Sequence, residues 1–156
     1  MIRKLFLTVG GSGLSPIAPG TVGSLVALPL GLLVQHYIGT ATLLLATLLV
    51  SVVAIKEIDR YLEGQENQDP SEIVIDELAG MWVALALTGH MPLVMQASLA
   101  FLAFRLFDIW KPSIIARAEI RYHGGIAVMA DDLLAGLFGG ILAAALYKGA
   151  LVLGLI

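Results

Sequence analysis

Five carboxylates in this sequence are placed where metal chemistry is possible: Asp76, Glu77, Asp108, Asp131 and Asp132. Each stands next to an apolar run, and acidic groups brought together there would repel each other unless a cation neutralised them. Mg²⁺ suits such a site, because a few carboxylates hold this hard ion together with waters and substrate phosphate. We therefore predict a Mg²⁺ site formed by Asp108, Asp131 and Asp132 with Asp76 or Glu77.

Asp108 belongs to a charged cluster that ends an uncharged run. Residues 78–104 contain no Asp, Glu, Lys or Arg, and Arg105, Asp108 and Lys111 then follow at intervals of three. That spacing puts them on about one face of a helix. The residue before Pro112 is biased away from the helical conformation, so the helix should end there. A carboxylate near a helix C-terminus opposes the helix dipole, so stability alone does not explain Asp108.

Cations near these acids could hold a phosphate group. Arg105, Lys111 and Arg121 are candidates for binding phosphate oxygens, the arginines through their bidentate fork. His123 lies in the same charged region and is a further candidate for substrate contact. We expect Arg105 and Lys111 to stabilise charge on the transferring phosphoryl group.

A Gly/Pro-rich segment near the N-terminus is a second candidate for anion binding. Residues 10–21 contain four glycines and two prolines, so they cannot form an ordinary helix. The backbone N–H groups of residues 10–13 could form an anion-binding concavity. Three hydroxyls could add to it: Ser12, Ser15 and Thr21.

Each acid also has a purely structural explanation. The pair at 131–132 could cap a helix N-terminus, and the pair at 76–77 could reach water from a membrane interface. Asp108 could simply form an ion pair with Arg105, three residues earlier. The metal hypothesis depends on the coincidence of these groups on one face of the molecule.

The composition is that of an integral membrane protein. Of 156 residues, 58% are apolar and 13% charged, whereas charged residues make up about a quarter of a soluble domain. Residues 5–55 carry no formal charge, which far exceeds the roughly 18 apolar residues of a spanning helix. We expect one membrane-embedded domain, residues 1–156. The lack of cysteine excludes a cysteine nucleophile, and the net charge of −3 argues against a nucleic-acid partner.

The expected fold is all-α, with about five transmembrane helices at residues 21–37, 40–62, 70–88, 93–111 and 133–153. Thr21 would cap the first helix, and Asp69 with Pro70 would open the third, leaving residues 76–77 beyond its first turn. Residues 113–129 would form an amphipathic connector, and residues 131–132 would open the last helix.

Alternation of five spans would sort the charges. All twelve acidic residues and eight of the nine Lys and Arg residues would then lie on one side, with only Lys148 opposite. Because basic residues are enriched on the cytoplasmic side, that side should be cytoplasmic.

Four stretches of the sequence resemble the phosphatidylglycerophosphatase A family of bacterial membrane enzymes: GSGLSPIAPGTVGS at 11–24, IDELAGMW at 75–82, FRLFDIWKP at 104–112, and HGG to DDLLAG at 123–136. The resemblance implies a Mg²⁺-dependent phosphatase of the inner (plasma) membrane. It would hydrolyse phosphatidylglycerophosphate to phosphatidylglycerol and phosphate at the cytoplasmic face. The five carboxylates, Arg105, Lys111 and the Gly-rich loop all match the family's motifs.

Three other functions remain open at this stage. A small ion-coupled transporter also uses intramembrane carboxylates, although it would place charges nearer the bilayer midplane. A non-catalytic membrane subunit would explain the hydrophobicity but not the position of Asp108. A head-group transferase would share the substrate, but the spaced aspartates of that class are missing. In the phosphatase, the attacking group could be a metal-activated water or a covalent Asp or His.

Overall fold

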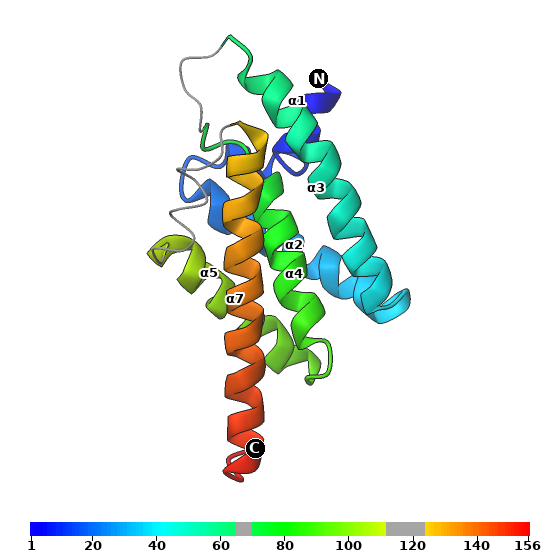
Figure 1. The fold of residues 1–156 in the computed structure, drawn as a ribbon, viewed down its shortest axis with the longest axis vertical. Helices are drawn as coiled ribbons and strands as arrows, with labels where there is room; N and C mark the ends of the chain where they lie inside the picture. The colour runs from blue at the N-terminus through cyan, green and yellow to red at the C-terminus, as the bar shows by residue number, and fades with distance from the viewer. Residues whose placement is uncertain (65–69, 112–123) are drawn as a thin grey trace.

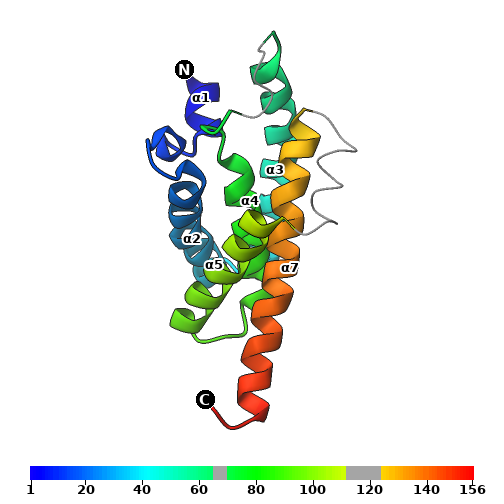
Figure 2. The same cartoon turned by 90° about the vertical axis from the view of Figure 1, so that its left-hand side faces the viewer.

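The computed structural model describes residues 1–64, 70–111 and 124–156, and within these ranges the chain forms helices joined by loops (Figures 1 and 2). The prediction of an all-α fold is confirmed. In chain order the elements are α1 (Ile2–Leu7), the 3₁₀-helix η1 (Ser12–Leu14), α2 (Pro19–Tyr37), α3 (Thr40–Leu62), α4 (Ile75–Thr88), α5 (Leu93–Trp110) and α7 (Gly125–Val152).

The central helix is α4, which packs against α2, α3, α5 and α7. Ten of its fourteen residues are buried, which explains why it is apolar on almost every side. Trp82 in its middle donates a hydrogen bond from Nε1 to Ala27 O of α2 at 3.0 Å. A side chain in the first turn of α4, such as Glu77, is therefore surrounded by neighbouring helices.

Within the described ranges, three helices are long and apolar enough to cross a membrane: α3, α5 and α7. On α3, Leu45 and Leu48 are 67% and 63% exposed, and a bilayer provides apolar surroundings for such side chains. The 28 residues of α7 extend about 42 Å, more than the roughly 30 Å of bilayer hydrocarbon. Because α2 and α4 do not meet the same criterion, the five-span count stays a prediction.

The start of α4 differs from the prediction. Asp69 lies outside the described residues, but residues 70–74 form a turn and an irregular segment, and the helix begins only at Ile75. Val74 has φ −140° and donates its N–H to Leu7 O at 3.0 Å, so a tertiary hydrogen bond replaces the predicted helical turn. Asp76 and Glu77 therefore lie in the first turn of α4 and not beyond it, where the helix dipole favours carboxylates.

The last helix also starts earlier than predicted. Residues 125–129 belong to α7 and not to a connector, so Asp131 and Asp132 lie inside the helix and do not open it. Gly125 donates its N–H to Asp59 Oδ1 of α3 at 2.7 Å. A Cβ on Gly125 would lie 2.3 Å from Ile55 O, so this glycine permits backbone contact with α3. The sequence pattern alone indicates only a break at this position.

Thr21 does not cap α2, because this helix begins at Pro19. Proline suits that first position, since its missing N–H would have no helical partner. The predicted range of α3, Thr40–Leu62, is confirmed, as is the end of α4 at Thr88. The end of α5 lies at Trp110, one residue before the predicted Lys111.

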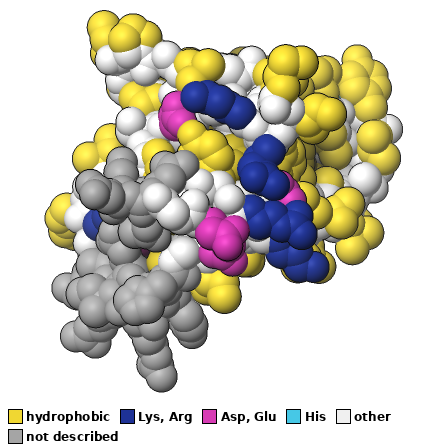
Figure 3. Space-filling model, turned by 90° about the horizontal axis from the view of Figure 1, so that it is seen from above, with side chains coloured by type: hydrophobic (Ala, Val, Ile, Leu, Met, Phe, Trp, Pro, Cys, Tyr) yellow, Lys and Arg dark blue, Asp and Glu magenta, His cyan; other side chains and the backbone are white. Residues whose placement is uncertain are grey.

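One end of the helix bundle carries exposed charges, and Figure 3 shows Lys, Arg, Asp and Glu side chains gathered there. Arg3 Nε of α1 lies 2.7 Å from Glu57 Oε2 of α3. Lys4 Nζ lies 3.1 Å from Glu72 Oε2 in the segment before α4. These ion pairs hold α1 across the ends of α3 and α4.

Candidate active site

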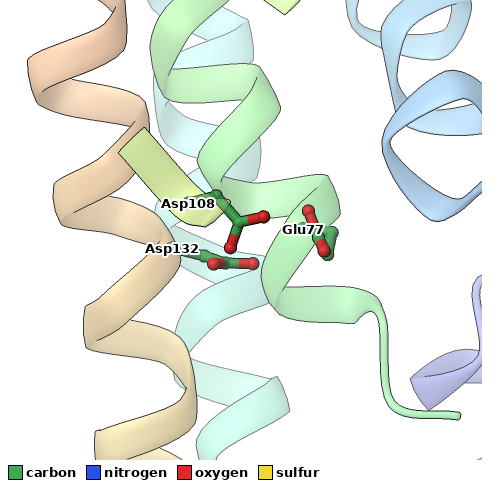
Figure 4. Close-up of side chains that lie close together, drawn as sticks. All are labelled: Glu77, Asp108 and Asp132. Carbon is green, nitrogen blue, oxygen red and sulfur yellow. The ribbon is translucent and has the colours of Figure 1, made fainter. Parts of the chain in front are cut away.

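Three of the five predicted carboxylates meet at the junction of three helices. Glu77 of α4, Asp108 of α5 and Asp132 of α7 each offer an oxygen, and these oxygens lie within 4.8 Å of one another. Figure 4 shows the three side chains pointing toward a common point. Glu77 and Asp132 are 8% and 5% exposed, so the cluster is screened from water, and we call these residues the acidic cluster.

Arg105 partly neutralises the acidic cluster. Its Nη1 atom lies 2.6 Å from Glu77 Oε2 and 2.8 Å from Glu77 Oε1, and 2.7 Å from Asp108 Oδ2. The structural explanation for Asp108, an ion pair with Arg105, is therefore present in the structure. This pair joins the acidic cluster to the guanidinium of Arg105.

The N-terminal part of α2 completes one wall of the site. Arg105 Nη2 donates to Thr21 Oγ1 at 3.2 Å. Ser24 Oγ lies 2.8 Å from both Glu77 Oε2 and Gly20 O, so its single proton donates to one of them at a time. A Cβ on Gly20 would lie 2.1 Å from Glu77 Oε1. Only glycine lets α2 come this close to the carboxylate.

Small residues also bring α4, α5 and α7 together. A Cβ on Gly136 of α7 would lie 2.1 Å from Gly80 O of α4. One turn further, a Cβ on Gly139 would lie 2.7 Å from the backbone N of Phe104 in α5. Small residues are typical of close helix crossings in membranes. Because the crossings lie next to Glu77, Asp108 and Asp132, they determine the spacing of the acidic cluster.

The remaining two predicted acids have other contacts. Asp131 forms an ion pair with Lys111, and Asp76 Oδ1 accepts the N–H of Glu77 at 2.9 Å. Neither belongs to the group of three oxygens that could share one ion. In each adjacent pair of acids, 76–77 and 131–132, one member therefore belongs to the acidic cluster and the other does not. The members in the cluster are Glu77 and Asp132.

The Gly-rich loop lies beside the site but uses its polar groups internally. The N–H groups of residues 10–13 donate to carbonyls of residues 5–9, so they give no support to the predicted anion-binding role. Ser12 Oγ donates to Thr8 O at 3.0 Å, and Ser15 Oγ donates to Ile17 O at 2.9 Å. Of the three predicted hydroxyls, only that of Thr21 contacts the side chains of the site. Two other predicted substrate contacts, Arg121 and His123, lie outside the described residues.

The donor set fits a hard divalent cation. The acidic cluster supplies only oxygen ligands, which Mg²⁺ and Ca²⁺ prefer. Ionisation of all three carboxylates would place three negative charges beside the single guanidinium of Arg105. Among the described residues, this cluster is therefore a site that could hold a metal ion.

Comparison with known proteins identifies the family. The sequence profile of the phosphatidylglycerophosphatase A family matches residues 5–147. The chain belongs to the phosphatidylglycerophosphatase A family. All the carboxylates of the site and Arg105 lie within the matched range. Membership of a phosphatase family argues against the transporter alternative. No solved structure matches the chain.

Relatives in the phosphatidylglycerophosphatase A family align over most of the chain. Phosphatidylglycerophosphatase A of Escherichia coli is 36% identical over 138 residues, covering 87% of this chain and 79% of the relative. The protein of the same name from Haemophilus influenzae is 33% identical, covering 86% and 83%. A Bacteroides thetaiotaomicron protein named as a candidate phosphatidylinositol-3-phosphatase is 37% identical, covering 86% of each chain.

Sequence reasoning missed two residues of this family member's site, Gly20 and Ser24. Both lie in the stretch 11–24 that carries the family resemblance, yet their types gave no direct sign of their roles. Gly20 acts through its lack of a side chain, and Ser24 is an ordinary helical residue until α2 is placed beside Glu77. The helical spacing of Gly20, Thr21 and Ser24 was the available signal, since residues three or four apart share a face.

Proposed function

We propose that this protein is a Mg²⁺-dependent phosphatase that hydrolyses phosphatidylglycerophosphate to phosphatidylglycerol and inorganic phosphate. The observation that carries the proposal is the convergence of Glu77, Asp108 and Asp132 from three helices beside Arg105. Mg²⁺ is favoured because it binds through a few carboxylates and keeps positions for water and phosphate oxygens. Membership of the phosphatidylglycerophosphatase A family supports the choice of lipid substrate.

Arg105 has two tasks in this proposal. Its contacts with Glu77 and Asp108 fix the acidic cluster, and its guanidinium provides positive charge where negative charge develops on the phosphoryl oxygens. A bound divalent cation would supply charge neutralisation for the phosphate and activation of an attacking water. Burial of the cluster strengthens these electrostatic effects, because the local dielectric is low.

Lys111 is the second cation assigned to the phosphate. Its side chain is 40% exposed while that of its partner Asp131 is 8% exposed, so the pair extends from the buried site toward water. We assign Asp131 the role of holding Lys111 at the site entrance, which revises its predicted role as a metal ligand. Asp76 supports the first turn of α4 through the Glu77 N–H. Arg121 and His123 remain candidates for substrate contact.

The site is placed at the cytoplasmic surface of the inner membrane in this proposal. From Asp132 to the end of α7 at Val152 there are 20 residues, or about 30 Å of helix, which equals the hydrocarbon thickness. The acidic cluster would therefore lie at one membrane surface. The basic residues Arg3 and Lys4 lie toward the same end of the bundle, which favours the cytoplasmic side.

Phosphate release by the purified protein tests the proposal. Detergent-solubilised protein is expected to release phosphate from phosphatidylglycerophosphate, to stop when EDTA is added, and to recover with excess Mg²⁺. Phosphatidylinositol-3-phosphate serves as the comparison substrate, because one relative is named for it. Faster turnover of that lipid would contradict the substrate assignment, and release that is insensitive to EDTA would contradict the metal assignment.

A further inference from the structure

Two apolar hollows lie along the membrane-facing side of α5. The first, about 780 Å³, is lined by Leu102, Arg105, Leu106, Ile109 and Trp110. The second, about 320 Å³, lies between α2 and α5 and is lined by Leu25, Leu28, Ala97, Ser98, Phe101 and Leu102. Both hollows share Leu102, whose side chain is 64% exposed. We call the two together the α5 groove.

The α5 groove begins at the acidic cluster. Arg105 lines its first hollow and contacts Glu77 and Asp108. Thr21 of α2 is hydrogen-bonded to Arg105, so the polar ends of α2 and α5 meet there. From this contact α2 leads toward its C-terminus and α5 toward its N-terminus, away from the polar end of the bundle, and the two helices cross in Figure 2.

Residues of the groove are arranged by depth below that polar contact. Leu25 and Leu28 follow Thr21 by one and two turns of α2. Leu102 precedes Arg105 by three residues, and Ala97 precedes it by eight, which corresponds to about 4.5 Å and 12 Å along α5. The second hollow therefore extends from the charged groups into the apolar part of the molecule, on a helix that is apolar enough to span the membrane. Most of the first hollow lies on the C-terminal side of Arg105, beside Leu106, Ile109 and Trp110.

Arg105 also retains unused hydrogen-bonding capacity. Its Nε atom is buried and has no hydrogen-bond partner among the described residues. A buried donor without an acceptor is costly, and an oxygen of a phosphate or an ester satisfies it. An amphipathic molecule with an acidic head and an apolar body matches both the donor and the groove.

We propose that the α5 groove binds the apolar body of the phospholipid substrate, with an acyl chain passing Leu102 into the hollow between α2 and α5. The inference rests on the proposed function and specifies how the substrate lies: phosphate at the acidic cluster, glycerol backbone beside Arg105, and chains along α5. Leu102 is then a specificity-determining residue that acts on the lipid body and does not touch the reacting phosphate.

Leu102→Trp fills the groove and provides the test. Leu48→Trp is the matched control, because Leu48 is equally exposed on α3 and lines neither hollow. Phosphate release is measured with dioleoyl and with dihexanoyl phosphatidylglycerophosphate in mixed micelles. Leu102→Trp should lower kcat/KM for the dioleoyl lipid by about tenfold, the loss expected when two methylene groups are kept from burial. It should leave the dihexanoyl value within about twofold, and the control should change neither.

Equal effects of Leu102→Trp on the two substrates, or no effect on either, would overturn the proposal. So would a control variant that shows the same selective loss. A second measurement does not depend on turnover: a phosphatidylglycerophosphate carrying a diazirine near the middle of an acyl chain is photocrosslinked to the wild-type protein. Peptides from α2 and α5 should be labelled, and Leu102→Trp should reduce that labelling.

The two measurements separate the possible failures. Phosphate release with labelling confined to α3 and α7 would refute the acyl-chain assignment and leave the proposed function intact. Labelling of α5 that Leu102→Trp reduces, without any phosphate release, would support the groove and refute the proposed function.

Discussion

Replacing Gly20 with alanine is expected to disable the site while preserving the fold. A Cβ at this position would lie 2.1 Å from Glu77 Oε1 and 3.1 Å from Glu77 Cδ, and contacts below 3.0 Å essentially never occur. The carboxylate must therefore withdraw by roughly 1 Å, because carbon and oxygen atoms repel steeply at shorter distances. Glu77 is the acid that links α2, α4 and α5, so its displacement affects the whole cluster.

The cost of that displacement follows from the hydrogen bonds that Glu77 makes. Its oxygens lie 2.6 and 2.8 Å from Arg105 Nη1 and 2.8 Å from Ser24 Oγ, and a shift of about 1 Å takes these contacts beyond hydrogen-bond range. Misplacing a catalytic group by this amount costs about 100-fold in rate, or about 2.7 kcal/mol of activation free energy. Alanine meanwhile favours the helical backbone by about 0.5–1 kcal/mol relative to glycine, which partly offsets the strain in folding.

Gly149→Ala is the matched control, because Gly149 lies in α7 and a Cβ added there would meet no atom within 4 Å. Phosphate release is measured across a range of Mg²⁺ concentrations, and thermal unfolding is followed in the same detergent. Gly20→Ala should lose activity and require more Mg²⁺, while Gly149→Ala should match the wild type. Wild-type turnover by Gly20→Ala would refute the inference that the position of Glu77 controls the reaction.

Asp132→Asn should lower kcat by about 10³-fold, since it removes a charge of the acidic cluster. Asp131→Asn should lower kcat by only about tenfold, as expected of a positioning residue. Phosphate release by both variants is the measurement, and equal losses would contradict the division of roles. Arg105→Lys should lower kcat by about 100-fold, because an ammonium cannot reproduce the fork that contacts Glu77 and Thr21; membrane insertion should be unchanged. The hydroxyl of Tyr61 and the ammonium of Lys4 lower the pKa of the Glu72 carboxyl. The ionised carboxyl therefore stabilises the fold above its ordinary pKa of 4.5, and this contribution is lost as the pH falls through the lowered pKa. The protection factor of the Val74 N–H, which corrects the exchange rate for its intrinsic pH dependence, should therefore fall at acidic pH, and Glu72→Gln should remove that dependence.

Local signals in the sequence were sufficient for some helix boundaries. Gly39 precedes α3, and Gly89 and Pro92 separate α4 from α5, so chain breaks and helix ends coincide there. The predicted starts of α4 and α7 are wrong because contacts between residues distant in sequence determine where these helices begin. Val74 is bound to Leu7, and Gly125 packs on α3, and neither contact has a local signature.

The sequence predicts which residue types form the candidate site, but not which acid of each adjacent pair belongs to it. Adjacent residues on a helix point about 100° apart, so only one acid of each pair, 76–77 and 131–132, can face a common point. Which one does so depends on how α4 and α7 are rotated against their neighbours. The rotation follows from the crossings at Gly80 and Gly136, which a single sequence does not reveal as a contact.

These crossings connect helix packing directly to the proposed chemistry. Any side chain at Gly136 would meet the carbonyl oxygen of Gly80 and force α7 away from α4. Asp132 lies one turn from Gly136, and Glu77 lies one turn from Gly80, so the same movement would widen the acidic cluster. Carboxylates that could share one ion need oxygens a few ångströms apart, as here. The glycines of α4 and α7 are therefore as important to the acidic cluster as its acids, because they set the distances between three carboxylates that could hold a metal ion.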